Sequence, residues 1–90
     1  MRTLRVAVEF EKDVQRMDAR GYKIKKLKDM VDLLRAGQPI PKNKRDHPLR
    51  GEWKNHRGCH IQGDWVLVYR VNGNELLLAR NGWHKDIFDE

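Results

Sequence analysis

The sequence has one cysteine, Cys59, and no long hydrophobic run, and these two scarcities exclude several classes of protein. A single thiol excludes an internal disulfide framework and a zinc site made of cysteines alone, and it fits a reducing cytoplasm. No apolar stretch approaches the roughly 20 residues that a membrane-spanning helix needs. The first ten residues alternate in polarity, unlike the apolar core of a signal peptide. The sequence therefore predicts a cytoplasmic protein with no membrane partner.

A chain of 90 residues is predicted to form one domain over residues 1–90, with a single modest core. It carries 19 lysines and arginines against 13 aspartates and glutamates, for a formal net charge of +6. A basic surface attracts polyanions by electrostatic steering and by the release of counterions from nucleic acid. The positive charge coincides with His47, His60 and His84 in the second half of the chain, which favours a nucleic acid as the partner.

Hydrophobic spacing divides the first part of the chain into a strand and two helices. Residues 4–10 alternate in the manner of a half-buried strand. Helical spacing predicts a first helix over residues 11–20, ended by Gly21, and a second helix that ends before Gly37. The apolar stripe of the second helix consists of Ile24, Leu27, Met30, Val31 and Leu34. Both helices are expected to cover a sheet.

Turn signals divide the rest of the chain. Three prolines predict an irregular surface loop over residues 38–50. Strands are predicted over residues 53–61, with a bulge at Gly58, over residues 65–71 and over residues 75–81. Asn72-Gly73 predicts a tight hairpin between the last two strands. The order β-α-α-β-β-β is an α+β fold, with a small antiparallel sheet of about four strands, two N-terminal helices on one face and a short C-terminal segment.

The three histidines are candidate catalytic residues, because imidazole exchanges protons near neutral pH. His47 lies in the predicted loop, His60 near the end of a strand and His84 after the last strand, and these places can meet over one sheet face. Asp64 stands close to His60 in the turn. Each histidine by itself also has a structural explanation, and strand alternation does not connect His56 with the others.

Arg80 is a candidate phosphate ligand. Alternation puts it on one side of the last strand with Leu76 and Leu78, at the end of an apolar row. A guanidinium has a fork geometry that suits phosphate oxygens, while the alternative for this position is an exposed residue at a strand end.

Four segments in order resemble one family of proteins. They read DHPLRGEWK at 46–54, RGCHI at 57–61, DWVLVY at 64–69 and RNGWHKDIF at 80–88. They resemble the YafQ branch of the RelE-like toxins, which are ribosome-dependent messenger RNA endonucleases of bacterial toxin-antitoxin modules. FEKD at 10–13 and LRAG at 34–37 also fit, so the resemblance covers nearly the whole chain. It implies a RelE-like fold, which agrees with the element order predicted above.

The resemblance implies roles for particular residues. The implied catalytic residues are His47, His60, Asp64 and His84, and the implied substrate-binding residues include Arg80 and Phe88. Trp65 stands where the family has an aromatic residue, so Phe88 or Trp65 is expected to stack on an unpaired base. Trp83 is a departure, because a small residue is common at that place in the family.

The implied chemistry needs neither metal nor cofactor. A base activates the ribose 2′-OH, an acid protonates the 5′-oxygen that leaves, and the product ends in a 2′,3′-cyclic phosphate. The sequence leaves open which histidine takes which role, with Asp64 orienting an imidazole or sharing the role of base. Lys54 and Arg57 are expected to help Arg80 stabilise the charged transition state.

The resemblance also implies partners: a cognate DinJ-like antitoxin, and the ribosome with messenger RNA in its A site. Operator DNA would be bound only through the antitoxin. Two other classes stay open. One is a zinc enzyme with His47, His60, His84 and Asp64 as ligands, although the sequence has no compact motif such as His-Glu-x-x-His. The other is a non-catalytic binding module that acts with an antitoxin.

Overall fold

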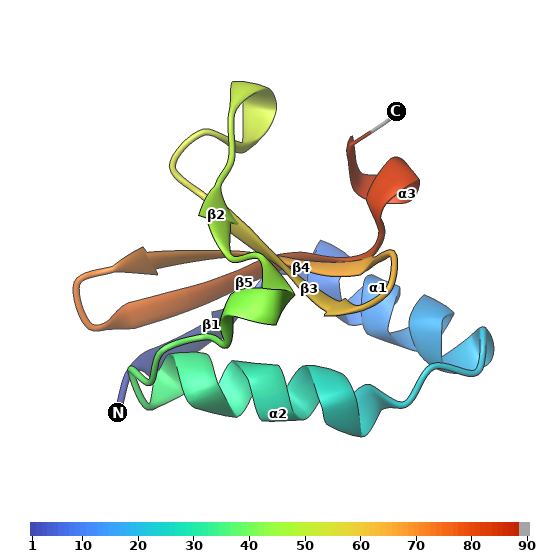
Figure 1. The fold of residues 1–90 in the computed structure, drawn as a ribbon, viewed down its shortest axis with the longest axis horizontal. Helices are drawn as coiled ribbons and strands as arrows, with labels where there is room; N and C mark the ends of the chain where they lie inside the picture. The colour runs from blue at the N-terminus through green and yellow to red at the C-terminus, as the bar shows by residue number, and fades with distance from the viewer. Residues whose placement is uncertain (89–90) are drawn as a thin grey trace.

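The computed structural model describes residues 1–88 as a five-stranded sheet between two layers of other elements (Figure 1). The strands lie in the order β1-β5-β4-β3-β2. Their bounds are Thr3–Val6 for β1, His47–Pro48 for β2, Arg57–Gln62 for β3, Trp65–Asn72 for β4 and Glu75–Trp83 for β5. The helices are α1 (Val8–Ala19), α2 (Ile24–Arg35) and α3 (His84–Phe88), and the 3-10 turns η1 (Lys42–Lys44) and η2 (Gly51–Trp53) flank β2. Within residues 1–88, no helix has the length and apolar character needed to cross a membrane.

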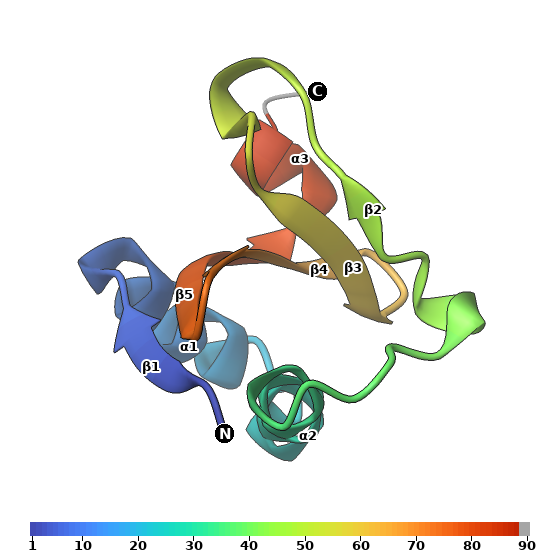
Figure 2. The ribbon, with the colours of Figure 1, turned by 90° about the vertical axis from the view of Figure 1, so that its left-hand side faces the viewer.

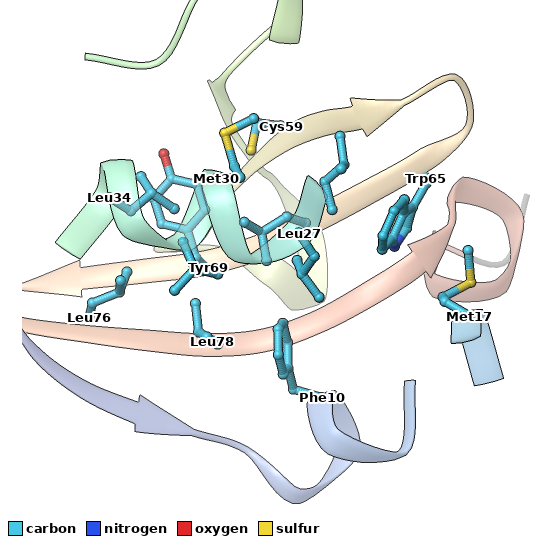
Figure 3. Packing of buried hydrophobic residues seen from close by; sticks show 13 residues of the cluster. Phe10, Met17, Leu27, Met30, Leu34, Cys59, Trp65, Tyr69, Leu76 and Leu78 are labelled. Carbon is cyan, nitrogen blue, oxygen red and sulfur yellow. The ribbon is translucent and has the colours of Figure 1, made fainter. Parts of the chain in front are cut away.

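The predicted α+β fold is confirmed, and α1 and α2 cover one face of the sheet as expected. Four residues of the predicted α2 stripe are buried: Leu27, Met30, Val31 and Leu34. Figure 3 shows Leu27, Met30 and Leu34 of α2 on the side of the helix that faces the sheet residues Tyr69 and Leu76. Complete burial of a side chain of this size contributes about 1.5–3 kcal/mol, so burial of the stripe attaches α2 to the sheet.

The central strand β4 is buried on both faces, as its uninterrupted apolar run predicted. Trp65, Leu67 and Tyr69 belong to the main core beneath the helices. Val66 and Val68 point the other way, into a smaller cluster with Ala79, Ile87 and their neighbours. We call the side of the sheet opposite α1 and α2 the open face. The β4 valines give this open face an apolar floor, on which short elements can pack.

The first strand is shorter than predicted, and it pairs in parallel with its neighbour where an antiparallel sheet was predicted. It ends at Val6, and α1 begins at Val8, so Val8 and Phe10 belong to the helix. Strand β1 pairs with β5 in parallel, which makes the sheet mixed and not purely antiparallel. Alternation misled here because Phe10 also stands at helical spacing from Met17, and both are buried against the sheet.

The strand predicted from Trp53 begins only at Arg57. Before it, Gly51 and Asn55 have φ values of 67° and 73°, a left-handed backbone that ends any extended run. The loop over residues 38–50 is also more regular than predicted, because His47 and Pro48 pair with β3 as a fifth strand. The β3 bulge lies between His60 and Gln62 and not at Gly58.

The hairpin between β4 and β5 is present, one residue later than its sequence signal. Asn72 is still paired, with Glu75, so the two loop residues are Gly73 and Asn74. Gly73 has a φ of 61°, while Asn74 stays at negative φ. A positive φ at the first central position alone is the pattern of a type II′ turn, which requires glycine there.

The carboxylate of Asp13 connects α1 to the end of β5. It is 1% exposed and accepts hydrogen bonds from Arg80 Nε at 2.7 Å, Arg80 Nη2 at 3.1 Å and the Asn81 backbone N–H at 3.1 Å. Arg16 Nη1 adds an ion pair at 3.1 Å. The side-chain hydrogen bonds to Asp13 raise the pKa of Arg80 above its usual value, so the guanidinium stays charged.

We predict that Asp13→Ala lowers the free energy of unfolding by about 3–5 kcal/mol, because it leaves the Arg80 guanidinium without its buried counter-charge. Asp18→Ala is the matched control, since Asp18 is an exposed aspartate on the same helix, and its expected effect is within about 0.5 kcal/mol. Urea unfolding followed by circular dichroism measures both. Equal effects of the two variants would contradict the role assigned to Asp13.

Candidate active site

A pocket of about 250 Å³ lies on the open face of the sheet. Its lining residues are His47, Leu49, Arg50, Gly58, Cys59, His60, Val66, His84 and Phe88. Three segments far apart in the sequence therefore bring together the three predicted histidines and Phe88. Figure 2 shows β2 and the loop after it standing on the same side of the sheet as α3, opposite α2.

Two of the histidines have one ring nitrogen engaged by the backbone. His47 Nδ1 lies 2.7 Å from the carbonyl oxygen of Arg45, and His60 Nδ1 lies 2.9 Å from that of Gly63. A carbonyl oxygen only accepts hydrogen bonds, so Nδ1 carries the proton in both rings. The neutral ring then keeps its lone pair on Nε2. In both residues Nε2 is therefore the nitrogen left to contact a substrate.

The segment that carries His47 is anchored through its neighbour Asp46. Tyr69 Oη donates to Asp46 Oδ1 at 2.6 Å, and Arg57 Nε lies 3.3 Å from the same oxygen. Burial, together with the hydrogen bond to Asp46, raises the pKa of Tyr69 well above its usual value, so the hydroxyl stays a donor. Arg57 is thereby engaged with Asp46 and does not line the pocket.

The pocket wall depends on a close approach at Gly58. A Cβ added there would meet Leu49 Cδ2 at 3.2 Å and Cδ1 at 3.4 Å, so the Leu49 side chain would have to shift by a few tenths of an ångström to admit one. The Leu49 N–H donates to the carbonyl of His56 at 2.9 Å and holds the wall to the chain before β3. Gly58 therefore has a packing function, and this accounts for a glycine that sequence patterns indicated as a bulge.

Helix α3 begins at His84 and presents two pocket residues. The His84 N–H donates to the carbonyl oxygen of Asp64 at 3.0 Å. The imidazole of His84 lies against the ring of Phe88, with 4.6 Å between centroids and 55° between planes. The spacing of four residues along α3 thus brings the His84 and Phe88 rings together. The turn between β3 and β4 holds His84, the first residue of α3, through the carbonyl of Asp64.

Side chains from the α1–α2 turn fasten the start of α3. The Arg20 guanidinium lies 3.7 Å over the Trp83 ring and 3.1 Å from Asp86. Trp83 Nε1 donates to Tyr22 Oη at 2.9 Å. Trp83 does not line the pocket. At a position where the family commonly has a small residue, this tryptophan therefore adds an anchor for α3.

The structure places the other predicted site residues away from the pocket. Trp65 is 0% exposed and donates Nε1 to Asn81 Oδ1 at 3.1 Å, so the prediction that its ring stacks on a base is wrong. The carboxylate of Asp64 is exposed and has no hydrogen bond or ion pair within residues 1–88. Lys54 is exposed next to η2 and does not line the pocket either.

Arg80 also differs from its predicted place. It does not line the pocket, and its guanidinium is engaged by Asp13 of α1. The β4–β5 register shifts between Val68 and Tyr69, which leaves Ala79 without a partner. The extra residue reverses the phase of alternation and sets Arg80 opposite Val68, on the other side of β5 from Leu76 and Leu78. The hydrogen bonds to Asp13, and not the strand register, therefore keep the Arg80 guanidinium out of the pocket. The arrangement therefore does not provide the expected Arg80 clamp within the pocket.

Sequence reasoning missed two residues of the site. Arg50 lines the pocket, and Asp46 anchors His47 from behind. Both belong to the segment 46–54 that carried the resemblance, so the signal was present. No pattern in the sequence, however, shows which side chains of an irregular loop point toward a neighbouring strand, so these two residues did not stand out from the rest of the segment.

A metal would need several ligands close together. In the described part of the chain, no group of three or more histidine, cysteine, aspartate or glutamate side chains is arranged to hold a metal ion. The three pocket histidines thus do not form a ligand set in this arrangement.

The sequence profile of the family "Bacterial toxin of type II toxin-antitoxin system, YafQ" matches residues 2–89. The chain belongs to this family. It is similar to the mRNA interferase toxin YafQ of Escherichia coli K12, at 34% identity over 97% of this chain and 96% of the relative.

Solved structures agree with this assignment. The crystal structure of YafQ from E. coli BL21(DE3) matches with a TM-score of 0.92 at 32% identity, over 98% of this toxin and 99% of that chain. YafQ in the E. coli DinJ-YafQ complex matches with a TM-score of 0.89 at 34% identity, over 98% and 99% of the two chains. A metal-bound toxin from Helicobacter pylori has a TM-score of 0.89 at 36% identity, over 98% and 100%. The predicted family is confirmed.

We predict that Cys59 resists alkylation in the native protein. Burial raises the pKa of its thiol to about 12, so at pH 8 about one molecule in 10⁴ carries the reactive thiolate. The rate with iodoacetamide, followed by mass spectrometry, should rise steeply between pH 8 and pH 11 while the fold persists. The same protein in denaturant is the control and should react fully at pH 8. Equal native and denatured rates would refute the burial of this thiol.

Proposed function

We propose that this toxin cleaves messenger RNA on the ribosome by metal-independent attack of a ribose 2′-OH. The observation that supports this function best is the convergence of His47, His60 and His84 in one pocket. The relative in E. coli is an mRNA interferase toxin, and a pocket with three imidazoles suits the proton transfers of RNA cleavage. No other titratable cluster in the described residues has this composition on an accessible face.

The pocket provides two interchangeable proton carriers. His47 and His60 each direct Nε2 away from a backbone carbonyl, so a neutral ring accepts the 2′-OH proton and a protonated ring donates to the 5′-oxygen. His84 forms the third wall and is the other candidate for either role. Each proton transfer of this kind is typically worth about 10² to 10⁴ in rate. The product carries a 2′,3′-cyclic phosphate.

Phe88 is the residue for base stacking. Its ring is half-buried, lines the pocket and packs on His84. A planar apolar ring at the pocket rim suits an unpaired base of single-stranded RNA, which is how side chains read RNA outside helices. Trp65, the alternative, is excluded because it is buried under α2.

A DinJ-like antitoxin is the proposed partner that silences this toxin, because the E. coli relative is seen in a complex with DinJ. The net charge of +6 suits both an acidic antitoxin segment and ribosomal RNA. The antitoxin would also supply the contact with operator DNA. Lys54 and Arg57 lie outside the pocket on the surface, where a contact to the RNA backbone is the role left for them. Asp64 also lies outside the pocket, and its carboxylate would repel a phosphate. The cytoplasm, where translated messenger RNA is found, is the proposed location.

We predict that His84→Gln, His47→Gln and His60→Gln each lower the rate of ribosome-bound messenger RNA cleavage by about 10² to 10⁴. Glutamine keeps the approximate size and polarity of the ring but does not carry a proton between pH 5 and pH 8. Single-turnover cleavage on a programmed ribosome, followed by primer extension, measures the rates.

His56→Gln is the matched control, because His56 packs on Trp53 and does not line the pocket. It should cleave at the rate of the unchanged toxin. Antitoxin binding and thermal unfolding of all four variants should stay close to those of the unchanged toxin. Full toxicity of His84→Gln in cells would refute the catalytic role of that residue.

We also predict that a single 2′-deoxynucleotide on the 5′ side of the scissile phosphate abolishes cleavage, because the internal nucleophile is then missing. Toxin treated with a chelator and then dialysed should cleave the all-ribose messenger at an unchanged rate. A zinc enzyme would lose activity after chelation, and one that activates water would still cut the deoxy-substituted RNA. A non-catalytic module would cut neither messenger, so the three classes are separated.

A further inference from the structure

We propose that Arg50 is the residue that binds the scissile phosphate and stabilises the charge that develops on it. This inference rests on the proposed RNA cleavage. A phosphorane gains negative charge in the transition state, and preorganised donors aimed at that charge are often the largest contribution to catalysis. Three imidazoles alone provide proton transfer, while a guanidinium adds a permanent positive charge.

Arg50 is the only lysine or arginine among the residues that line the pocket. Its side chain is exposed and forms no hydrogen bond or ion pair with the described residues 1–88. The nearby cations that sequence reasoning favoured are engaged elsewhere. Arg80 binds Asp13 at 2.7 Å, and Arg57 lies 3.3 Å from Asp46. Among residues 1–88, the positive charge of Arg50 is thus the one that no anion neutralises at the site.

The backbone on both sides of Arg50 is held in place. The carbonyl of Arg50 accepts the N–H of Trp53 at 3.3 Å, which closes η2. On the other side, Leu49 packs against Gly58 and donates its N–H to His56. A fixed backbone with an unpaired guanidinium is the arrangement that a phosphate ligand needs, because the side chain breaks no existing ion pair when it binds.

The apolar part of the pocket lining also favours a contact between Arg50 and a phosphate. The floor of the pocket consists of Val66 and the Gly58 backbone, and its rim holds the rings of His84 and Phe88. An apolar floor lowers the local dielectric constant, which strengthens the attraction between Arg50 and a phosphate. A phosphodiester of single-stranded RNA is therefore the ligand class that the pocket fits.

The test uses single-turnover cleavage of ribosome-bound messenger RNA by the full-length toxin. Arg50→Ala should lower the rate by about 10² to 10³, with its midpoint of thermal unfolding unchanged. Arg50→Lys keeps the charge but loses the fork and should recover only part of this loss. Added methylguanidinium should raise the rate of Arg50→Ala, and urea at the same concentration should not.

Arg70→Ala is the matched control, because Arg70 lies on β4 and does not line the pocket. It should cleave like the unchanged toxin with or without methylguanidinium. Cleavage by Arg50→Ala at the unchanged rate would overturn the proposal and leave the proposed function standing. Loss of cleavage in Arg50→Ala with no rescue and a lowered unfolding midpoint would also overturn it, because Arg50 would then be structural. Failure of the unchanged toxin to cleave would overturn the proposed function and this inference together.

Discussion

The structure depends on one buried carboxylate. Asp13 accepts hydrogen bonds from Nε and Nη2 of Arg80, from Arg16 and from the Asn81 backbone N–H. These charge-assisted hydrogen bonds attach α1 to the last part of β5. Asn81 in turn accepts from Trp65 and donates to the carbonyl of Phe10. This network lies immediately before α3. The place where the chain turns toward the open face is therefore set from inside the core.

The site itself stands on elements too short to be stable by themselves. Strand β2 has two residues and α3 has five, while an isolated helix needs about 12–15 residues to form in water. Side chains compensate for this: Tyr69 holds Asp46 on one wall, and Arg20 holds Trp83 and Asp86 on the other. The apolar β4 floor carries both walls. The stable layer of helix and sheet thus supports a less regular layer that carries the chemistry.

Sequence patterns predicted best those elements whose residues share one environment along their whole length. The α2 stripe and the apolar run of β4 are of this kind, and both are buried as expected. Sequence patterns failed where the periodicity of the side chains changes within an element or at its end. Val8 and Phe10 satisfy strand and helix periodicity at once, and the bulge at Ala79 reverses the alternation on which the placing of Arg80 depended. Neither error is visible without the pairing of strands.

The sequence by itself determined the family and the order of the elements apart from β2 and α3, and it indicated the three histidines that meet in the pocket. These follow from residue types and their spacing, which the chain carries independently of its folding. Only the tertiary structure decided which cations face the pocket, because that depends on the partners that each guanidinium meets. Arg80 meets the buried Asp13 and Arg57 meets Asp46, while Arg50 meets no anion among the described residues and lines the pocket with His47, His60 and His84. Such pairings join residues up to 67 positions apart, beyond the reach of any local pattern.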